Sequence, residues 1–123
     1  MFEKHGISVV LGASPNPSRA SYMAVQRLSD RGMTVRAIGI RDGEISGVKI
    51  ETGRPEIDEV ETLTLYIGQK NMVDWGEYAL NLNPKRIIFN PGTENSEFEA
   101  EARSAGIHVE RACTLVMLSN NSY

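Results

Sequence analysis

The chain has 123 residues, of which 41% are hydrophobic and 24% charged, as is typical of one globular domain. Its net charge of −3 and its scattered Lys and Arg residues exclude the basic surface of a nucleic-acid-binding protein and a polybasic membrane-binding segment. The single cysteine excludes an intramolecular disulfide, and no apolar run has the length of a membrane span. We therefore expect a single domain over residues 1–123, located in the cytoplasm.

Five short apolar runs predict β-strands, at Ile7–Ala13, Thr34–Ile40, Thr62–Ile67, Arg86–Asn90 and His108–Ala112. The first, third and fourth runs are apolar or β-branched with little alternation, which is typical of strands covered on both faces of a parallel sheet. The fifth run alternates more and predicts an edge strand.

Helical patterns separate most of these strands. Ser21 is a candidate N-cap for a helix that ends at Arg31, and a second helix is predicted from about Asn71 to Leu82. A third opens with the capping-box spacing Ser96-x-x-Glu99. The alternation predicts an α/β fold: a three-layer domain with a mainly parallel sheet of about five strands.

Two segments break this pattern. Residues 41–60 are rich in turn-forming Gly and Asp, and they predict an irregular link with at most one helical turn near Pro55–Val60. The last residues, "SNNSY", are polar, and we expect them to fray.

The stretch "VVLGASPNPSRASY" contains the first candidate site, because ligands of open parallel sheets lie beyond the carboxyl ends of the strands. Small residues in the loop permit close approach of a ligand, and the N–H groups at the start of the next helix attract phosphate. Hydroxyl groups, two stiffening prolines and one guanidinium complete the loop: Ser14, Ser18, Ser21, Pro15, Pro17 and Arg19. The alternative is a simple strand–helix connection with Arg19 in solvent.

Neither standard nucleotide motif is present. The chain has no Gly-x-x-x-x-Gly-Lys-Ser/Thr, and Ser14 and Asn16 stand where a dinucleotide fingerprint has glycines. After the second strand, Asp42 could hold a ribose diol, whereas Arg41 before it suits a ribose that carries a phosphate. This order favours coenzyme A or NADP over NAD, unless both side chains are simply solvated.

The same stretch resembles the opening of small stand-alone CoA-binding proteins, which are related to the CoA-binding domain of the succinyl-CoA synthetase alpha subunit. The matching residues are Gly12-Ala13-Ser14, Asn16-Pro17-Ser18-Arg19 and Tyr22. Two later segments, "GVKIETGRPEIDEVETLTLYI" and "RIIFNPGTENSEFEAEARSAGIHVERAC", are also similar to that family, so that the resemblance covers the whole chain.

The resemblance implies a Rossmann-like fold that binds CoA with its pyrophosphate at the first loop. It implies a phosphate site made of Gly12, Ala13, Ser14, Pro17, Ser18 and Arg19, with Asn16 and Tyr22 of the same motif beside it. It also implies that Pro91 and Gly92 lie beside the pantetheine path.

Two departures fall where the adenosine half would lie. The family usually has Asn-Pro after its second strand, where this chain has Gly39-Ile40-Arg41. It often has an aromatic residue followed by arginines after its third strand, where this chain has Tyr66 and then Ile67-Gly68-Gln69. We include Gly39, Ile40, Arg41 and Tyr66 in the candidate site.

No catalytic set is evident in the sequence, and no His, Cys, Asp or Glu cluster has metal-ligand spacing. His5 and His108 precede or begin strands, at the end of the sheet away from a ligand. Cys113 follows the fifth strand, and we interpret it as a small buried hydrophobe rather than as a redox partner of a bound thiol. The acidic residues of the second and third helices are interpreted as solvated or first-turn charges: Asp74, Glu77, Glu94, Glu97, Glu99 and Glu101. Trp75 and Tyr78 are expected to pack the second helix or an interface.

The sequence thus predicts a protein that binds coenzyme A or an acyl-CoA without catalysis of its own. Two alternatives stay open: an NADP-dependent or CoA-linked enzyme, and a structural interaction domain with a vestigial nucleotide site. We expect a small-molecule nucleotide cofactor as partner, with no nucleic acid or membrane, and a homodimer or a protein partner stays open.

Overall fold

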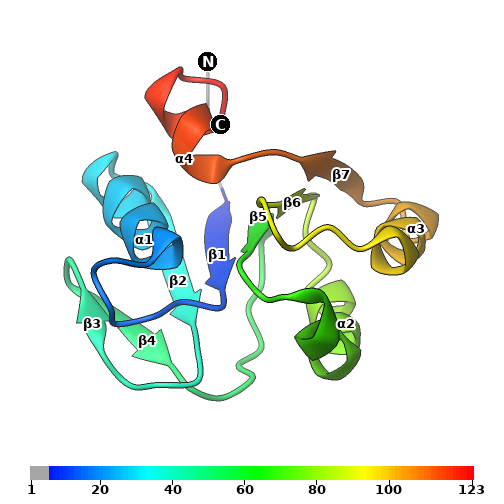
Figure 1. The fold of residues 1–123 in the computed structure, drawn as a ribbon, viewed down its shortest axis with the longest axis horizontal. Coiled ribbons are helices and arrows are strands. Elements are labelled where there is room, and N and C mark those ends of the chain that lie inside the picture. Colours follow the sequence, from blue (N-terminus) through cyan, green and yellow to red (C-terminus); the bar gives the residue numbers. More distant parts are fainter. Residues whose placement is uncertain (1–5) are drawn as a thin grey trace.

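A seven-stranded sheet forms the centre of the computed structural model, which describes residues 6–123. The strand order is β3-β4-β2-β1-β5-β6-β7 (Figure 1). The strands are β1 (Ile7–Leu11), β2 (Thr34–Ile38), β3 (Glu44–Ile45), β4 (Val48–Glu51), β5 (Val60–Leu65), β6 (Arg86–Phe89) and β7 (His108–Arg111). Every neighbouring pair is parallel except the antiparallel β3–β4 pair.

Four α-helices and one 3₁₀ turn connect or follow the strands. They are α1 (Ala20–Asp30), η1 (Gln69–Asn71), α2 (Met72–Asn81), α3 (Ser96–Ser104) and α4 (Thr114–Ser119). The structure confirms the predicted α/β class with a mostly parallel sheet, and β7 is an edge strand as its alternation predicted.

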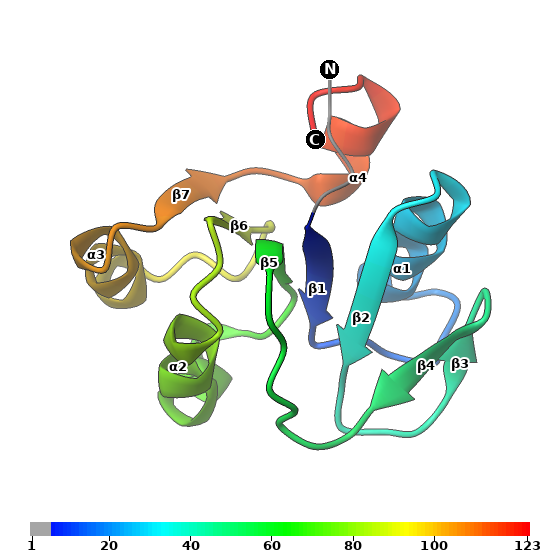
Figure 2. The ribbon, with the colours of Figure 1, turned by 180° about the vertical axis from the view of Figure 1, so that it is seen from behind.

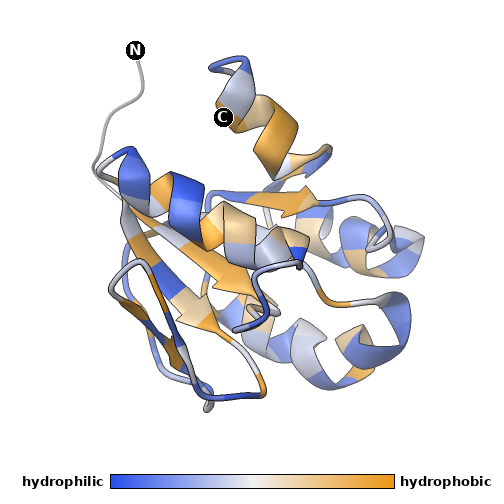
Figure 3. Cartoon of the chain, turned by 60° about the vertical axis from the view of Figure 1, so that its left-hand side comes forward, coloured by the Kyte–Doolittle hydropathy of each residue, from blue (hydrophilic) through white to orange (hydrophobic). Residues whose placement is uncertain are grey.

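The core has two parts, one on each face of the sheet, because successive side chains of β1 point to opposite faces. Val9 and Leu11 pack in a cluster with side chains of α2 and α3, whereas Val10 packs in a second cluster with side chains of α1 and α4. Figure 3 shows the apolar residues concentrated on the strands and on α4, with more polar turns on the outer side of α1. The fold is therefore a three-layer α/β arrangement.

The predicted number of strands was too low, because residues 41–60 contain the β3–β4 hairpin (Figure 2). Ser46 and Gly47 form its turn with positive φ angles of 49° and 83°. At most one helical turn was predicted near Pro55–Val60, and the described segment has none there, because it runs as bends into β5.

Two predicted helix starts are also corrected. The N-cap of α1 is Arg19, and Ser21 lies buried inside the first turn. The N-cap of α3 is Asn95, whose side chain accepts a hydrogen bond from the Phe98 N–H at 3.1 Å. The predicted capping box is therefore shifted by one residue, and Glu99 accepts from the Asn95 N–H at 3.0 Å.

The expectation of a frayed carboxyl end was wrong. Residues 114–119 form α4, and Leu118 belongs to the core on the α1 side. The Tyr123 ring packs against the same core, and its hydroxyl lies 2.8 Å from the hydroxyl of Ser8 at the start of β1.

The strand order reverses beside β1, which pairs with β2 on one side and with β5 on the other. The helix that follows β1 covers one face of the sheet, and the helix that follows β5 covers the opposite face. A crevice therefore opens beyond the carboxyl end of β1, at the topological switch point where ligands of open α/β sheets bind.

Candidate functional site

A pocket of about 620 Å³ lies at this switch point. We call it the first-loop pocket. It is lined by Leu11, Gly12, Ala13, Ser14, Pro15, Asn16, Arg19, Ala20, Ser21, Ile38, Gly39, Ile40, Arg41, Tyr66, Ile67, Gly68, Asn71 and Trp75. The structure thus brings together segments that follow β1, β2 and β5.

The backbone at Gly12 is shaped by its neighbours rather than left free for a ligand. Gly12 has φ +101°, and a Cβ at this position would lie 2.9 Å from the backbone of Tyr66. The N–H groups of Gly12 and Ala13 both donate to the Ile38 carbonyl, at 2.8 and 2.9 Å. Any other residue at position 12 would therefore be strained, and these two N–H groups are already occupied.

The loop beyond Ala13 is held by its own polar groups. The Asn16 N–H donates to the Ser14 hydroxyl oxygen at 3.1 Å. The Asn16 side-chain oxygen accepts from the Ser18 N–H at 3.0 Å and from the Ser18 hydroxyl at 2.9 Å. These bonds form an Asx-type turn that delivers the chain into α1. The Ser14 hydroxyl hydrogen is not used in them, so Ser14 retains a donor for a ligand.

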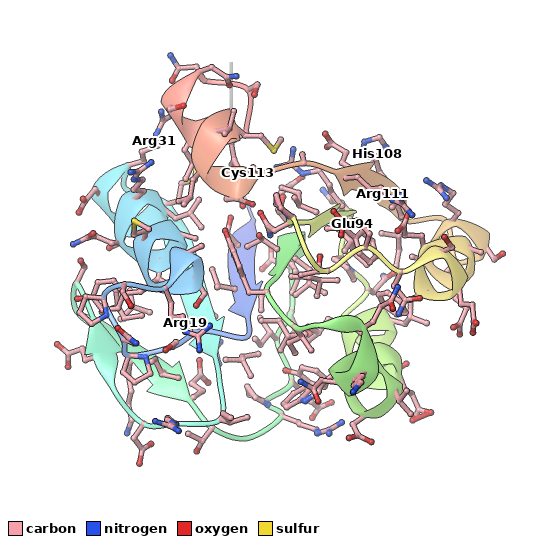
Figure 4. All side chains as sticks on the ribbon, in the orientation of Figure 1. Arg19, Arg31, Glu94, His108, Arg111 and Cys113 are labelled. Carbon is pink, nitrogen blue, oxygen red and sulfur yellow. The ribbon has the colours of Figure 1, made fainter. Side chains whose placement is uncertain are left out.

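The first turn of α1 faces the pocket and has no side-chain cap. Its N-cap Arg19 makes no capping hydrogen bond, and the turn contains no acidic residue. Arg19, Ala20 and Ser21 all line the pocket. Because the N-terminal N–H groups of a helix carry partial positive charge, an uncapped N-terminus that opens into a pocket favours an anion. Figure 4 shows Arg19 at this end of α1.

The segment after β2 forms one end of the pocket. Gly39 lies so close to the Ala13 carbonyl that a Cβ would collide with it. Ile40 follows with 83% of its side-chain surface exposed, and the exposed Arg41 follows Ile40. Arg41 lines the pocket and Asp42 does not. The end of the pocket therefore carries a cation and an uncovered apolar side chain.

The segment after β5 contributes Tyr66, Ile67 and Gly68. Burial raises the pKa of Tyr66 to about 12, so the phenol stays protonated at neutral pH. Its hydroxyl has no hydrogen-bond partner within residues 6–123. Tyr66 is therefore a neutral wall of the pocket and a poor general base.

Two residues at the start of α2, its N-cap and a residue of its first turn, were missed as site residues. Asn71 and Trp75 line the pocket, four residues apart on one side of the helix start. The Arg54 guanidinium lies 4.1 Å from the centre of the Trp75 ring, and Trp75 also forms an edge-on pair with Tyr78 at 5.7 Å. No sequence motif marks this aromatic residue as part of a site, because its approach depends on where α2 packs.

Five of the candidate site residues lie outside the pocket lining. Pro17 and Ser18 are exposed on the outer side of the first loop, and Tyr22 packs against the core on the α1 side. Pro91 and Gly92 are exposed in the loop after β6, where the Gly92 N–H donates to the Glu94 carboxylate at 3.0 Å. The other nine candidates line the pocket together: Gly12, Ala13, Ser14, Asn16, Arg19, Gly39, Ile40, Arg41 and Tyr66.

His108 and Cys113 lie outside the pocket lining. His108 is exposed at the start of β7, where its Nε2 lies 3.3 Å from the Glu110 carboxylate. Cys113 is half-buried before α4, far from Arg19 in Figure 4. His5 lies outside the described residues. Within residues 6–123, no group of three His, Cys, Asp or Glu side chains could hold a metal ion.

Of the two interpretations of Glu99, as a solvated or as a first-turn charge, only the second is confirmed: Glu99 lies in the first turn of α3 but is not solvated. Its side chain is only 4% exposed and accepts hydrogen bonds from Arg111 Nε at 3.0 Å and from the Asn95 N–H. Burial alone would raise the pKa of Glu99, but these hydrogen bonds and the charges of Arg111 and Arg103 outweigh it and lower the pKa. Glu99 thus joins α3 to β7.

The parallel sheet with its crevice, the glycine turn and the uncapped helix start define a Rossmann-like domain with a site suited to a phosphate-containing ligand. A model of the CoA binding domain family matches residues 8–119. The chain therefore belongs to the CoA binding domain family, as its first loop suggested.

Solved structures have the same fold. A crystal structure of an uncharacterized protein is 41% identical to this chain, with a TM-score of 0.93, covering 98% of this chain and 100% of that one. A cell-free expressed protein from Thermus thermophilus, ID.343, is 23% identical with a TM-score of 0.82, covering 97% and 91%. A hypothetical protein from Pyrococcus horikoshii OT3 is 24% identical with a TM-score of 0.80, covering 95% and 83%. The search of curated proteins gave no match.

Proposed function

We propose that this protein binds coenzyme A or an acyl-CoA in the first-loop pocket and performs no catalysis of its own. The observation that carries the proposal is the uncapped N-terminus of α1 opening into a pocket, in a chain of the CoA binding domain family. The whole of residues 1–123 acts as one binding domain in this proposal, and its single cysteine suits the cytoplasm.

The diphosphate lies at the start of α1 in this proposal. The first-turn N–H groups and the Ser14 hydroxyl donate hydrogen bonds to it, and the Arg19 guanidinium supplies a permanent positive charge. Gly12 and Ala13 donate no backbone hydrogen bond to the diphosphate in this proposal, because their N–H groups already donate to the Ile38 carbonyl. Their contribution is their small size. Pro17 and Ser18 support the loop from its outer side.

The adenosine half lies at the end of the pocket formed by Ile40 and Arg41. The uncovered Ile40 side chain offers an apolar surface to the base, and Arg41 pairs with the phosphate on the ribose. The position of Arg41 in the lining, with Asp42 outside it, supports a phosphorylated ribose over the free diol of NAD.

The pantetheine arm leaves the diphosphate on the other side, over Tyr66 and Gly68 towards Asn71 and Trp75. These residues offer apolar and amide surface, which suits an arm of methyl, methylene and amide groups. The proposal keeps Pro91 and Gly92 beside the pantetheine path, as the family resemblance implies, although they lie outside the pocket lining.

The proposal includes no catalysis because of the kinds of side chain that line the pocket. The ionisable side chains among the described lining residues are Arg19, Arg41 and Tyr66, and none of the three is suited to act as a base at neutral pH. An NADP-dependent or CoA-linked enzyme therefore needs reactive groups from a second protein.

Calorimetric titration with CoA, dephospho-CoA, NADP and NAD tests the proposal. We expect CoA to bind most tightly, and we expect Arg19→Ala to weaken CoA binding about tenfold through loss of a charge-assisted contact. Arg27→Ala is the matched control, because Arg27 is also an exposed arginine of α1 but lies in its last turn.

Each other outcome favours a named alternative. Binding of NADP without CoA would favour the enzyme. Absence of binding by all four ligands would favour an interaction domain with a vestigial site. Equal loss in Arg19→Ala and Arg27→Ala would contradict the position of the diphosphate at the start of α1.

A further inference from the structure

A second hollow lies between α2 and α3, on the side of α2 that faces away from the first-loop pocket. It has a volume of about 420 Å³, and we call it the α2–α3 groove. Its lining consists of Met72, Val73, Gly76, Glu77, Leu80, Asn95, Glu97, Phe98 and Glu101. None of these residues lines the first-loop pocket, so the two hollows are separate.

The floor of the groove is apolar and structurally fixed. The Phe98 ring forms an edge-on pair with Phe89 of β6 at 5.9 Å, so it is anchored in the core. Gly76 of α2 packs beside it, and a Cβ at Gly76 would lie 3.4 Å from the Phe98 ring, at van der Waals contact. At the mouth, Val73 has 87% of its surface exposed, the largest exposed fraction of any large hydrophobic residue within residues 6–123.

The rim of the groove is acidic. Glu77, Glu97 and Glu101 are exposed and form no ion pair within the described part of the chain. No Lys or Arg lines the groove. Glu99 of the same helix differs from these three residues, because it lies outside the groove lining and forms ion pairs with Arg103 and Arg111. Within residues 6–123, therefore, no cationic side chain pairs with the three rim carboxylates, and only Glu97 gains stabilisation from the N-terminus of α3.

We propose that the α2–α3 groove is a docking site for a basic amphipathic helical segment of another protein. Apolar side chains of that segment cover Val73 and the Phe98 floor, and its Lys or Arg side chains pair with the rim carboxylates. The argument is charge complementarity around an apolar depression, the arrangement that helix-in-groove recognition uses. This proposal does not rest on CoA binding.

A second copy of this chain is a less suitable occupant. A two-fold contact through the groove would bring Glu77, Glu97 and Glu101 of one copy close to the same residues of the other. Like charges brought together in this way oppose association. A basic partner segment instead brings positive charges close to these carboxylates, which favours association.

Fluorescence anisotropy with synthetic peptides tests the proposal. The probes are fluorescein-labelled peptides of about 14 residues, or four helical turns, with a Leu stripe on one face and Lys elsewhere, in a small panel of stripe widths. The control peptides carry Glu in place of Lys. We expect at least one Lys peptide to bind and the Glu peptides not to bind.

Two variants of the groove and one charge-matched control test where the peptide binds. Glu77→Lys/Glu101→Lys is expected to weaken the Lys peptide at least about tenfold, because attraction at the rim becomes repulsion. Asp30→Lys/Glu44→Lys makes the same change in net charge at exposed positions on α1 and β3, and we expect no more than a small effect. Val73→Ser keeps the charge and removes the exposed apolar contact, and we expect several-fold weaker binding. All three variants change exposed side chains, and circular dichroism confirms that each is folded.

Three results would overturn the proposal. The first is absence of binding by every Lys peptide at millimolar protein. The second is an equal loss in the two charge-reversal variants, which would show non-specific attraction. The third is self-association in analytical ultracentrifugation that Glu77→Lys/Glu101→Lys abolishes, which would make a second copy the occupant.

Discussion

At the scale of single residues, the proposed function gives Arg41 the task of distinguishing CoA from dephospho-CoA. The exposed guanidinium lines one end of the pocket, beside Ile40. If it pairs with the ribose phosphate, Arg41→Ala should weaken CoA binding about five- to tenfold and leave dephospho-CoA binding nearly unchanged. Calorimetric titration of both ligands measures the difference.

Lys49→Ala is a suitable control for this prediction, because Lys49 is an exposed cation of the neighbouring strand β4 and lies outside the pocket lining. An equal loss for both ligands in Arg41→Ala would mean that Arg41 contacts another part of the cofactor.

The buried carboxylate of Glu99 leads to a prediction about acid stability. Its pKa is lower in the folded protein than in the unfolded chain, because hydrogen bonds from Arg111 and Asn95 outweigh the effect of burial. Such a group contributes stability above its unfolded pKa of about 4.3, and the contribution is lost as the pH falls through the folded value.

Glu99→Gln should therefore lower the free energy of unfolding at pH 7, by on the order of 1 kcal/mol for the weakened hydrogen bonds. The difference from the wild type should begin to shrink below about pH 4.3, where Glu99 of the unfolded chain takes up a proton, and should disappear as the pH falls through the lower pKa of the folded protein. Urea denaturation at a series of pH values tests this. Glu97→Gln, at an exposed carboxylate of the same helix, is the control for the change of residue type and should cost much less stability at pH 7, whereas a difference in Glu99→Gln that stays constant with pH would contradict the assignment.

At the scale of elements, Asn90 joins three parts of the structure at the end of β6. Its amide nitrogen donates to the Thr64 hydroxyl at 2.7 Å and to the Leu65 carbonyl at 2.8 Å, both on β5. Its side-chain oxygen accepts from the Thr114 N–H at 2.8 Å, at the start of α4. Asn90 thus takes the place of a capping side chain for a short helix that has none of its own.

Asn90→Ala should reduce the free energy of unfolding by about 2–3 kcal/mol, because it leaves a buried N–H and a buried carbonyl without partners. Urea denaturation measures the loss. Asn81→Ala, at an exposed asparagine at the end of α2, should cost much less. Similar stability of the two variants would show that water replaces the Asn90 bonds.

The elements predicted from the sequence are those with a long, clear pattern. Continuous apolar runs identified β1, β5 and β6, and the glycine and capping signals placed α1 and α3 to within about a turn. The β3–β4 hairpin was missed because Glu44–Ile45 is too short to show alternation. α4 was missed because its six residues have no cap of their own and depend on Asn90, which is 24 positions earlier in the sequence.

The candidate site, like the secondary structure, could be predicted only in part from the sequence. The first loop could be identified because its glycine, hydroxyls and arginine are close together in the sequence, and the loop after β2 because the end of the second strand is where such folds hold a ribose. Asn71 and Trp75 could not be identified, because only the packing of α2 brings them to the pocket. The orientation of Glu99 was also unpredictable, because Arg111 joins it from a different element.

At the scale of the whole molecule, the two ends of β1 have different roles. Its carboxyl end, at Leu11, opens into the first-loop pocket. At its other end, the buried Ser8 hydroxyl lies 2.8 Å from the Tyr123 hydroxyl, which closes a contact across 115 positions of the sequence. The Arg86 guanidinium lies 4.8 Å from the centre of the Tyr123 ring. Figure 1 shows the C-terminus at this end of the molecule, beside α4.

This separation predicts that stability and ligand binding respond independently. Tyr123→Phe should lower the free energy of unfolding by about 1 kcal/mol, because the buried Ser8 hydroxyl loses its partner. Tyr123→Ala should lower it by about 2 kcal/mol or more, because ring packing and the contact with Arg86 are lost as well. Ser122→Ala is the control, since the exposed Ser122 side chain bonds only to the nearby Asn120.

Urea denaturation measures the stability of these variants, and calorimetric titration with CoA under conditions where each variant is folded measures binding. We expect the affinity for CoA to stay at the wild-type value in all of them, because the altered contacts lie at the amino end of β1 and the pocket at its carboxyl end. A loss of affinity in a variant that is still folded would mean that strain at Tyr123 reaches the pocket through β1, and the two ends would then have to be treated as one coupled unit.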